Sequence, residues 1–388
     1  MSIHQSSEIS ICQFINSSIK RLTAPVVISL AVVVLVAGCG GSGAMPPPPP
    51  ASTPPPAPPT ATAFVLTQSG AERPYGLLSA VALPGGRLLW TATIPGQSAV
   101  GLVVAPRLGR AYVLAGPPFA LTPVSLSTGT VGKPIRVGSA AWSVALAPDG
   151  TTAYVANAGD AIAYMPGAIG STITPVNLRT GRAGPAINVG DGPCGIAFAG
   201  HSTAYVSLPL SGHLARVSLA ARRAGAGVAV PSVGIGQANA PCAMAVSARA
   251  GLLAVGNLQQ DIAFPAPVVN LLDLASHRWR RPITLPGTSN SVRELGFSPD
   301  ARHVYVSAQT RSGLGVALYI ASIATGRVTQ ASLTGQPVTF ALTPDGGTLW
   351  VASALASGRT ALLPVSTTTG RPGPAVAYLS GPPVAIGL

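Results

Sequence analysis

Charged residues are scarce in this sequence, at 9% of its 388 residues, compared with roughly a quarter in typical soluble domains. Acids are scarcest, with 10 Asp and Glu against 23 Lys and Arg, and there are five His and four Cys. The motifs HExxH, GxSxG, CxxCH and the Walker loop are all absent, so no signature points to a zincin, an α/β-hydrolase, a c-type cytochrome or a P-loop nucleotidase. Abundant Ala, Val and Leu with little charge exclude a disordered chain.

Only one long hydrophobic run is present, from Ala24 to Ala37, and it follows Lys20 and Arg21. At about fourteen residues it suits a signal peptide better than a membrane span, which needs about twenty. The run ends in Val-Ala-Gly-Cys at residues 36–39, which resembles the lipobox of bacterial lipoproteins. That resemblance implies cleavage before Cys39 and acylation of its sulfur; the alternative is an uncleaved short anchor. We therefore expect residues 1–38 to be a signal peptide and the mature chain to be lipid-anchored outside the cytoplasm, at the cell membrane or outer membrane.

Residues 39–62 contain the acylated Cys39 and a proline-rich segment with five consecutive prolines, Pro46 to Pro50. Such a segment cannot build a core and favours extended polyproline II. We interpret it as a spacer between the membrane and the folded domain; recognition by a proline-binding module is the alternative.

A repeat of roughly 42 to 51 residues runs from residue 63 to the C-terminus, and a period of this size with strand-like units predicts a β-propeller. Each unit has two strands joined by a turn, often Pro-Asp-Gly, and the second strand opens with an aromatic residue in six of seven units. The residues at this position are Phe64, Tyr112, Tyr154, Tyr205, Ala254, Tyr305 and Trp350. We expect this column to pack between blades and not to bind a ligand.

The third unit reads APDGTTAYVANAG and then TPVNLRTGRAGPAINVGDGPCGIAF, and later units repeat it as SPDARHVYVSA and TPDGGTLWVAS. These segments resemble the YVTN repeat of surface-layer and related bacterial propellers. The resemblance implies the fold and little about activity, because the family includes binding proteins, scaffolds and a few enzymes. The fold expected is an all-β, seven-bladed β-propeller over residues 63–388.

The two ends of this domain complement each other. Residues 382–388 read as a first strand without a blade after it, and Phe64 to Leu66 as a second strand without a first. Pairing the N- and C-terminal strands would complete one blade and leave no open edge.

Arginines gather at the turns after the first and third strands, which share the face that we call the lower face. The turns after the third strands carry Arg87, Arg182, Arg223, Arg278, Arg327 and Arg371. A one-sided basic surface attracts polyanions such as phospholipid headgroups or wall polymers. Nucleic acid is not expected, since the chain is exported and shows no interleaving of aromatic and basic residues. The alternative is that turns need polar residues and arginine is the one used here.

The opposite face, the upper face, carries the mouth of the central channel. The residues expected to line it are Trp142, Asp160, Tyr164, Asp191, Asn239, Asp261, Arg293 and Glu294. Acids, amides and aromatic side chains together suit a small polar or cationic ligand, or a protein partner. Ordinary loop polarity is the alternative.

Cys194 and Cys242 occupy equivalent positions in adjacent units. Two buried free thiols are the favoured interpretation. A cross-blade disulfide is the second, and it needs Cα atoms within about 7 Å. A redox or metal site is the third and lacks a matching third ligand.

The function expected is a non-catalytic binding or scaffolding module at the cell envelope, with a protein, polymer or small ligand at the upper mouth and no cofactor or metal. The alternative is an envelope hydrolase or lyase of lactonase type. A paired-carboxylate mechanism would need two acids across one cleft, such as Asp160 with Asp191 or Asp261 with Glu294. Some lactonase and lyase propellers instead use a channel metal held by acids and Asn or His, and the channel ring here offers at most Glu294.

Overall fold

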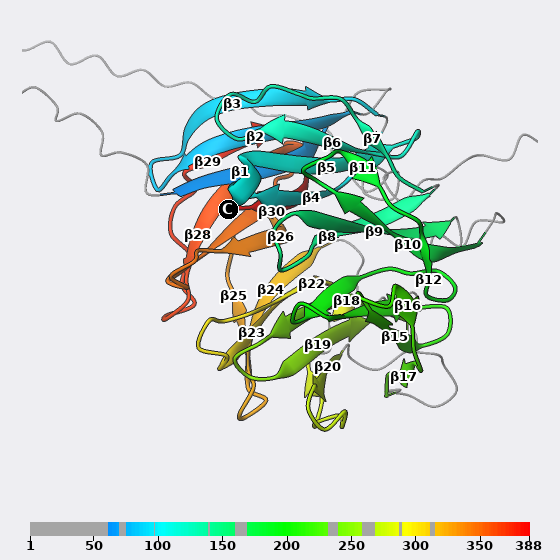
Figure 1. Ribbon diagram of the computed structural model, residues 1–388. Coiled ribbons are helices and arrows are strands. Elements are labelled where there is room, and N and C mark those ends of the chain that lie inside the picture. Colours follow the sequence, from blue (N-terminus) through cyan, green and yellow to red (C-terminus); the bar gives the residue numbers. More distant parts are fainter. Residues whose placement is uncertain are drawn as a thin grey trace, which may run out of the picture. The chain divides into compact units, whose positions relative to one another are not determined.

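A computed structural model describes residues 61–69, 75–96, 98–138, 140–159, 169–231, 240–257, 268–286, 289–310 and 315–388. These residues form seven antiparallel sheets arranged as the blades of a β-propeller (Figure 1). The only helical element within these ranges is a 3-10 turn, η2 (Pro106–Leu108). The expected all-β, seven-bladed propeller is thereby confirmed. No helix among the described residues is long and apolar enough to cross a membrane, and the hydrophobic run and Cys39 lie outside them.

The strands form four layers from the axis outward. In order from blade 1 to blade 7, the innermost strands are β30 (Pro383–Gly387), β4 (Ser98–Ala105), β8 (Ala141–Leu146), β13 (Ile196–Ala199), β18 (Pro241–Ser247), β22 (Ser289–Phe297) and β26 (Gln336–Leu342). The second strands are β1 (Ala61–Gln68), β5 (Arg110–Gly116), β9 (Thr152–Gly159), β14 (Thr203–Leu208), β19 (Leu252–Asn257), β23 (His303–Thr310) and β27 (Thr348–Ala354). The third strands are β2 (Gly76–Leu83), β6 (Ala120–Ser125), β10 (Ile169–Asn177), β15 (His213–Ser218), β20 (Val268–Asp273), β24 (Val316–Ser322) and β28 (Arg359–Ser366).

The outermost strands are short in six blades and split in two of them. They are β3 (Arg87–Ile94), β7 (Ile135–Arg136), β11 (Arg182–Ala183) with β12 (Ile187–Asn188), β16 (Arg223–Ala224) with β17 (Val228–Ala229), β21 (Ile283–Thr284), β25 (Val328–Ala331) and β29 (Ala377–Ser380). Short and interrupted edge strands limit pairing with other chains.

The ring closes through the two ends of the domain. Strand β1 pairs with β2 on one side and with β30 on the other, with Leu66 opposite Ala385. In Figure 1 the blue strands β1 to β3 therefore lie beside the red and orange strands of blade 7. The predicted closure is confirmed, although β1 begins at Ala61 and is longer than the Phe64 to Leu66 segment expected.

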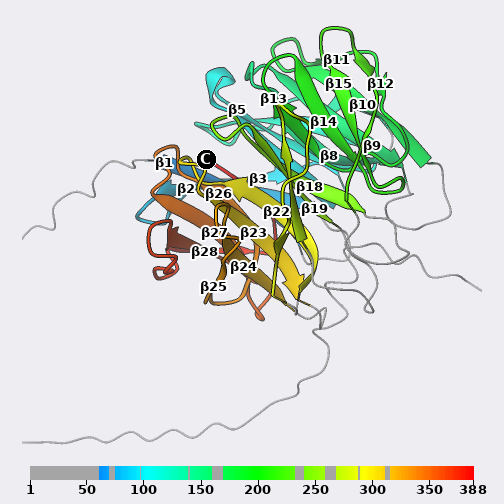
Figure 2. The ribbon, with the colours of Figure 1, turned by 90° about the horizontal axis from the view of Figure 1, so that it is seen from below.

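Figure 2 shows the blades in a view turned by 90° from Figure 1. The core lies between blades, in seven main clusters that each join two consecutive blades around the ring. The aromatic column supplies much of it: Tyr112, Tyr205 and Tyr305 are each 1% exposed. The ring of Tyr154 meets Phe198 of the next blade with centroids 5.5 Å apart. The packing role expected for this column is confirmed. Contacts divide the chain into two compact units, the second of which is Pro59–Leu388, and a compact unit with its own core can fold alone.

Seven equivalent hairpins join the third and fourth strands, and each turn needs one residue in the left-handed region. Five use glycine, namely Gly86, Gly129, Gly181, Gly326 and Gly370, and two use Arg222 (φ 52°) and His277 (φ 55°). Gly86 is required for a second reason, because a Cβ atom there would lie 1.8 Å from the carbonyl oxygen of Val376 in blade 7.

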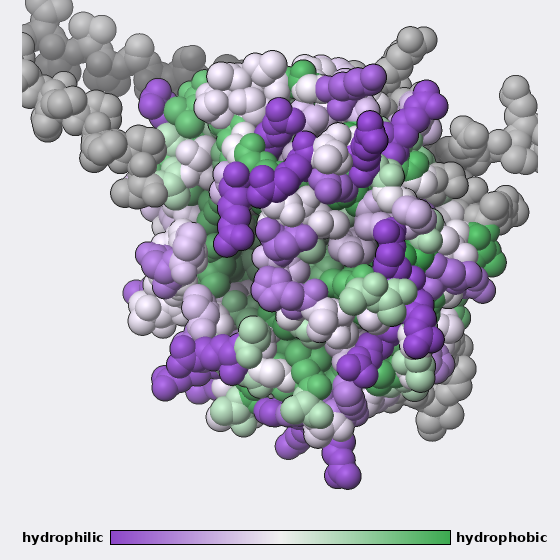
Figure 3. Space-filling view, viewed as in Figure 1, coloured by the Kyte–Doolittle hydropathy of each residue, from purple (hydrophilic) through white to green (hydrophobic). Residues whose placement is uncertain are grey.

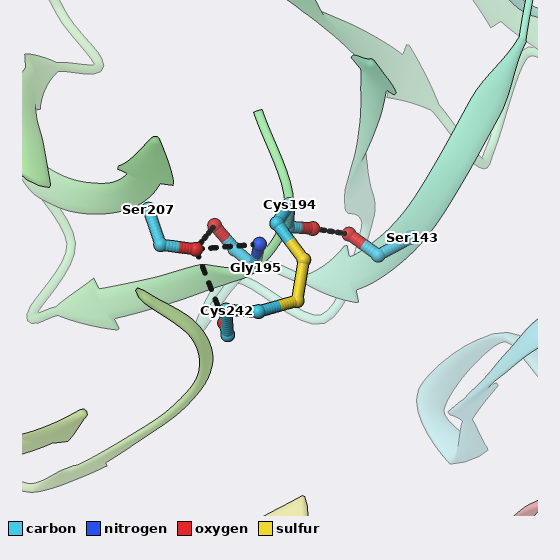
Figure 4. Close-up of a disulfide and its surroundings, with 5 residues drawn as sticks. All are labelled: Ser143, Cys194, Gly195, Ser207 and Cys242. Carbon is cyan, nitrogen blue, oxygen red and sulfur yellow. Dashed lines mark hydrogen bonds between the residues drawn. A yellow bond between two sulfur atoms is a disulfide. The ribbon is translucent and has the colours of Figure 1, made fainter. Parts of the chain in front are cut away.

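Cys194 and Cys242 form a disulfide with their Cα atoms 5.1 Å apart (Figure 4). The favoured interpretation of two free thiols is therefore wrong. Ser207 of β14 donates to the Cys242 carbonyl oxygen at 3.1 Å, and Ser143 of β8 donates to the Cys194 carbonyl oxygen. The disulfide thus lies in a hydrogen-bonded seam near the axis, where inner strands of neighbouring blades approach closely enough for a covalent link.

Candidate functional site

The six arginines predicted on the lower face occupy one repeated structural position. In each of these hairpins the end of the third strand pairs with the residue five positions later, and the arginine is that later residue. The closing pairs around the ring are Ala82–Arg87, Ser125–Thr130, Asn177–Arg182, Ser218–Arg223, Asp273–Arg278, Ser322–Arg327 and Ser366–Arg371. Six of seven blades therefore present an exposed arginine at the same height on the same face. We call this set the arginine ring.

The sequence builds these hairpins with side chains that cap the turn. Asn177 Oδ1 accepts from the backbone N–H groups of Arg179 and Thr180, each at 3.0 Å. Asp273 accepts in the same way from Ser276 at 3.0 Å. Asn, Asp and Ser favour such turns because their short side chains reach the backbone two or three residues on. The turns hold the start of each outer strand, and hence its arginine, in a fixed place.

The carboxylates on the lower face accept hydrogen bonds or form ion pairs within their own turns. Asp345 accepts hydrogen bonds from the Thr343 hydroxyl and the Gly347 N–H, which lower the pKa of its carboxyl. Hydrogen bonds from the Ser298 hydroxyl and the Arg302 N–H lower the pKa of Asp300 likewise. Asp273, whose position the sequence did not reveal, forms an ion pair with Arg280 at 2.8 Å. None of these pairs includes a member of the arginine ring.

A groove of about 720 Å³ lies between blades 2 and 3 on this face. Five cationic side chains line it, and all of them are exposed: Arg110, Lys133, Arg136, Arg179 and Arg182. No Asp or Glu is among its lining residues. Hydrophilic side chains are visibly gathered over this region, around β5, β7 and β11 (Figure 3). We call it the basic groove.

The sequence placed Arg182 on the lower face but did not single out Lys133, Arg136 or Arg179. Arg136 belongs to β7, and Lys133 lies just before it, in the stretch between the Val124–Val131 bridge and Ile135 where strand pairing is interrupted. Blade 2 has Thr130 at the ring position, so these two residues supply the cations there. The sequence signal for these cations was the Lys-Pro-Ile-Arg segment at residues 133–136. Its proximity to Arg179 follows only from the three-dimensional arrangement.

The upper mouth is described only in part. Asp160, Tyr164, Asn239 and Asp261 lie outside the described residues. Trp142 packs, partly buried, near the disulfide, and Asp191 is exposed. Arg293 is exposed and reaches the Gln309 side chain at 3.4 Å. No hydrogen bond or ion pair joins any two of the four described mouth residues, and nowhere in the described ranges do three His, Cys, Asp or Glu side chains gather as for a metal ion.

Among the described acids, Glu294 is the one whose pKa is raised. Burial raises the pKa of its carboxyl to about 7, although hydrogen bonds from Thr339 and from the Phe340 N–H favour the ionised form. A perturbed acid in a channel is a candidate for catalysis. Here, however, the Glu294 carboxyl accepts a hydrogen bond that links two innermost strands. Asp261, the acid expected opposite it, lies outside the described residues.

Comparisons with known proteins add the fold alone. No protein-family model matches the sequence, and no curated protein matches it. Among solved structures the chain is similar to hydrazine synthase from Kuenenia stuttgartiensis, with 19% identity and a TM-score of 0.58 over 69% of this chain and 76% of that chain. At this identity the similarity concerns the propeller architecture and carries nothing about activity.

Proposed function

We propose that the protein is a non-catalytic binding module of the cell envelope whose lower face docks on an anionic envelope component. The arginine ring carries this proposal. Six exposed guanidinium groups repeat at one position around a single face, and the acids of that face are held in turns or paired elsewhere. The summed field of such a ring attracts polyanions and raises their rate of association.

The expected signal peptide and acylated Cys39 give the proposal its setting. A proline-rich spacer of the length seen in residues 39–62 would hold the propeller away from the lipid anchor, at about 3.1 Å per residue if fully extended. We propose the YVTN-type propeller as its family, on the sequence motifs described above. A partner at the upper mouth is the weaker part of the proposal, because the described mouth residues do not converge on one site.

Binding of the purified propeller, residues 59–388, to protease-treated bacterial envelopes tests this proposal. Wild-type protein should sediment with envelopes at low salt and be released at high salt, because exposed charge pairs are screened. The Arg182→Glu, Arg278→Glu, Arg327→Glu triple variant should lose this binding. Salt-insensitive binding, or binding that the triple variant retains, would refute docking through the lower face.

A further inference from the structure

We propose that the basic groove holds a single chain of a phosphodiester polymer with a non-aromatic repeat, such as a polyol phosphate. This inference rests on the proposed function and names the class of anion that the lower face binds. The groove lies between blades 2 and 3 and has a volume within the range of ordinary ligand sites. Its charge distinguishes it: five cations line it and no carboxylate does.

The cations of the groove are available to a ligand. The described ion pairs join Arg280 to Asp273 and Arg302 to Asp300, so none of the five takes part in one within these ranges. Like charges in one groove repel each other, and folding alone gives no reason to collect them. A bound polyanion would relieve that repulsion and release its counterions, as it does for nucleic-acid phosphates.

The floor of the groove is rigid and preformed. Tyr112, Leu178 and Ile135 line it, and all three belong to the core between blades 2 and 3. The Tyr112 hydroxyl donates to the Leu178 carbonyl oxygen at 3.0 Å, which fastens one wall to the other. A ligand would not have to order these walls on binding, and preorganisation of this kind favours affinity.

The lining also distinguishes among anions. The hydroxyls of Ser125, Thr130 and Thr180 accompany the cations, and Arg, Lys, Ser and Thr are the side chains that hold phosphate oxygens in nucleic-acid complexes. Tyr112 is 1% exposed, so its ring offers no face on which a base could stack. A concave groove admits a single chain but not a planar bilayer. These features favour a phosphodiester chain without bases over nucleic acid or membrane.

A second hollow continues the path of such a chain. It lies between blades 3 and 4, has a volume of about 350 Å³, and shares Arg182 with the basic groove. Arg222 lines it as well and is anchored by a 2.9 Å hydrogen bond to the Pro185 carbonyl oxygen. Two adjacent hollows joined by a common arginine suit a repeating ligand that crosses more than one blade.

Equilibrium binding of fluorescent synthetic poly(glycerol phosphate) to residues 59–388 tests the inference. The groove variant Lys133→Gln, Arg136→Gln, Arg179→Gln should bind roughly 10-fold more weakly or worse, and its salt slope should fall by about 2, at about 0.7 for each phosphate that is no longer neutralised. The matched control Arg249→Gln, Arg281→Gln, Arg359→Gln loses the same net charge at exposed residues that belong to neither the groove nor the arginine ring, and it should bind nearly as wild type. Thermal unfolding checks that both variants fold; if the groove variant does not, its three single substitutions replace it.

The outcomes separate this inference from the proposed function. A groove variant that binds as tightly as wild type, alongside an Arg278→Gln, Arg327→Gln, Arg371→Gln ring variant that loses binding, would overturn the groove while leaving docking by the lower face intact. Equal losses in the groove and control variants would mean that net charge alone sets the affinity and would also overturn the groove. Equally tight binding of polyglutamate would overturn the phosphodiester assignment, and tighter binding of phosphatidylglycerol vesicles would overturn the single chain. Wild-type protein that binds none of these anions would overturn both proposals.

Discussion

Glu294 Oε2 accepts a hydrogen bond from the backbone N–H of Phe340 at 2.9 Å, which links the innermost strands of blades 6 and 7. The contact places a carboxyl in a buried seam of the ring, and that burial raises its pKa to about 7. The folded protein therefore keeps a proton on Glu294 at pH values where the unfolded chain has released it.

Stability should consequently fall as the pH rises from about 4.5 to about 7, at up to about 1.4 kcal/mol per pH unit from this group alone. Above pH 7 both states are ionised and the contribution becomes constant. Glu294→Gln should remove this part of the pH dependence, measured as the unfolding midpoint of the variant against wild type. Parallel pH profiles for the two proteins would contradict the assignment.

The carboxyl of Asp345 should change stability with pH in the direction opposite to Glu294, and Asp345→Asn tests this. Its pKa is lowered by the Thr343 and Gly347 hydrogen bonds, so its contribution is present above its unfolded pKa of 3.8 and is lost as the pH falls through the folded value. The asparagine variant should flatten the acid side of the profile and leave the region from about pH 5 to about 7 unchanged. A changed slope in that upper region would show that the carboxyl has another role.

The disulfide should be detectable and stabilising. Intact mass should rise by two hydrogens on reduction of the unfolded protein. The residues are 48 apart in sequence, so a chain-entropy estimate gives a stabilisation of about 4 kcal/mol. Cys194→Ser with Cys242→Ser should lower the unfolding midpoint accordingly. An unchanged mass after reduction would mean that the thiols are free.

Two substitutions at equivalent positions of the hairpin turns should change stability in opposite directions. His277 adopts φ 55°, which costs a non-glycine residue about 1 kcal/mol, so His277→Gly should raise the unfolding midpoint. Gly326→Ala should lower it by a similar free energy. No atom lies within 4 Å of an added Cβ at Gly326, so the loss would come from the backbone alone. Shifts of the same sign in both variants would refute the left-handed turn.

Closure of the ring predicts a strong dependence on the last eight residues. A chain ending at Ser380 lacks β30, which packs Ile386 into the core between blades 7 and 1 and Val384 into the core between blades 1 and 2. The loss should be on the order of 5 kcal/mol, seen as a lower midpoint or a non-cooperative transition in thermal unfolding. As a control, a chain beginning at Pro59 keeps β1 and should unfold like the mature protein. Equal midpoints for both truncations would contradict closure through β1 and β30.

Periodicity was enough to predict the architecture. The aromatic column and the Pro-Asp-Gly turns specify where second strands begin, and the complementary ends specify the closure, because a propeller repeats local contacts. The arginine ring followed from the same repetition, since each Arg sits at a constant offset from its turn.

The features that sequence reasoning missed depend on contacts between blades. Lys133 and Arg179 are separated by 46 positions in the numbering, and only the packing of blade 2 on blade 3 joins them in one groove. The bond between Cys194 and Cys242 depends on a 5.1 Å separation of Cα atoms near the axis, a distance that spacing alone does not give. Asp273 was overlooked because its role is set by Arg280, which belongs to an outer strand segment.

The salt dependence of poly(glycerol phosphate) binding to the wild-type propeller tests the central claim, that clustered cations on the lower face hold a polyanion. If the five groove cations each contact one phosphate, the logarithm of the association constant should fall with the logarithm of salt concentration with a slope of roughly −3.5. A slope near zero, or no binding at low salt, would contradict the claim.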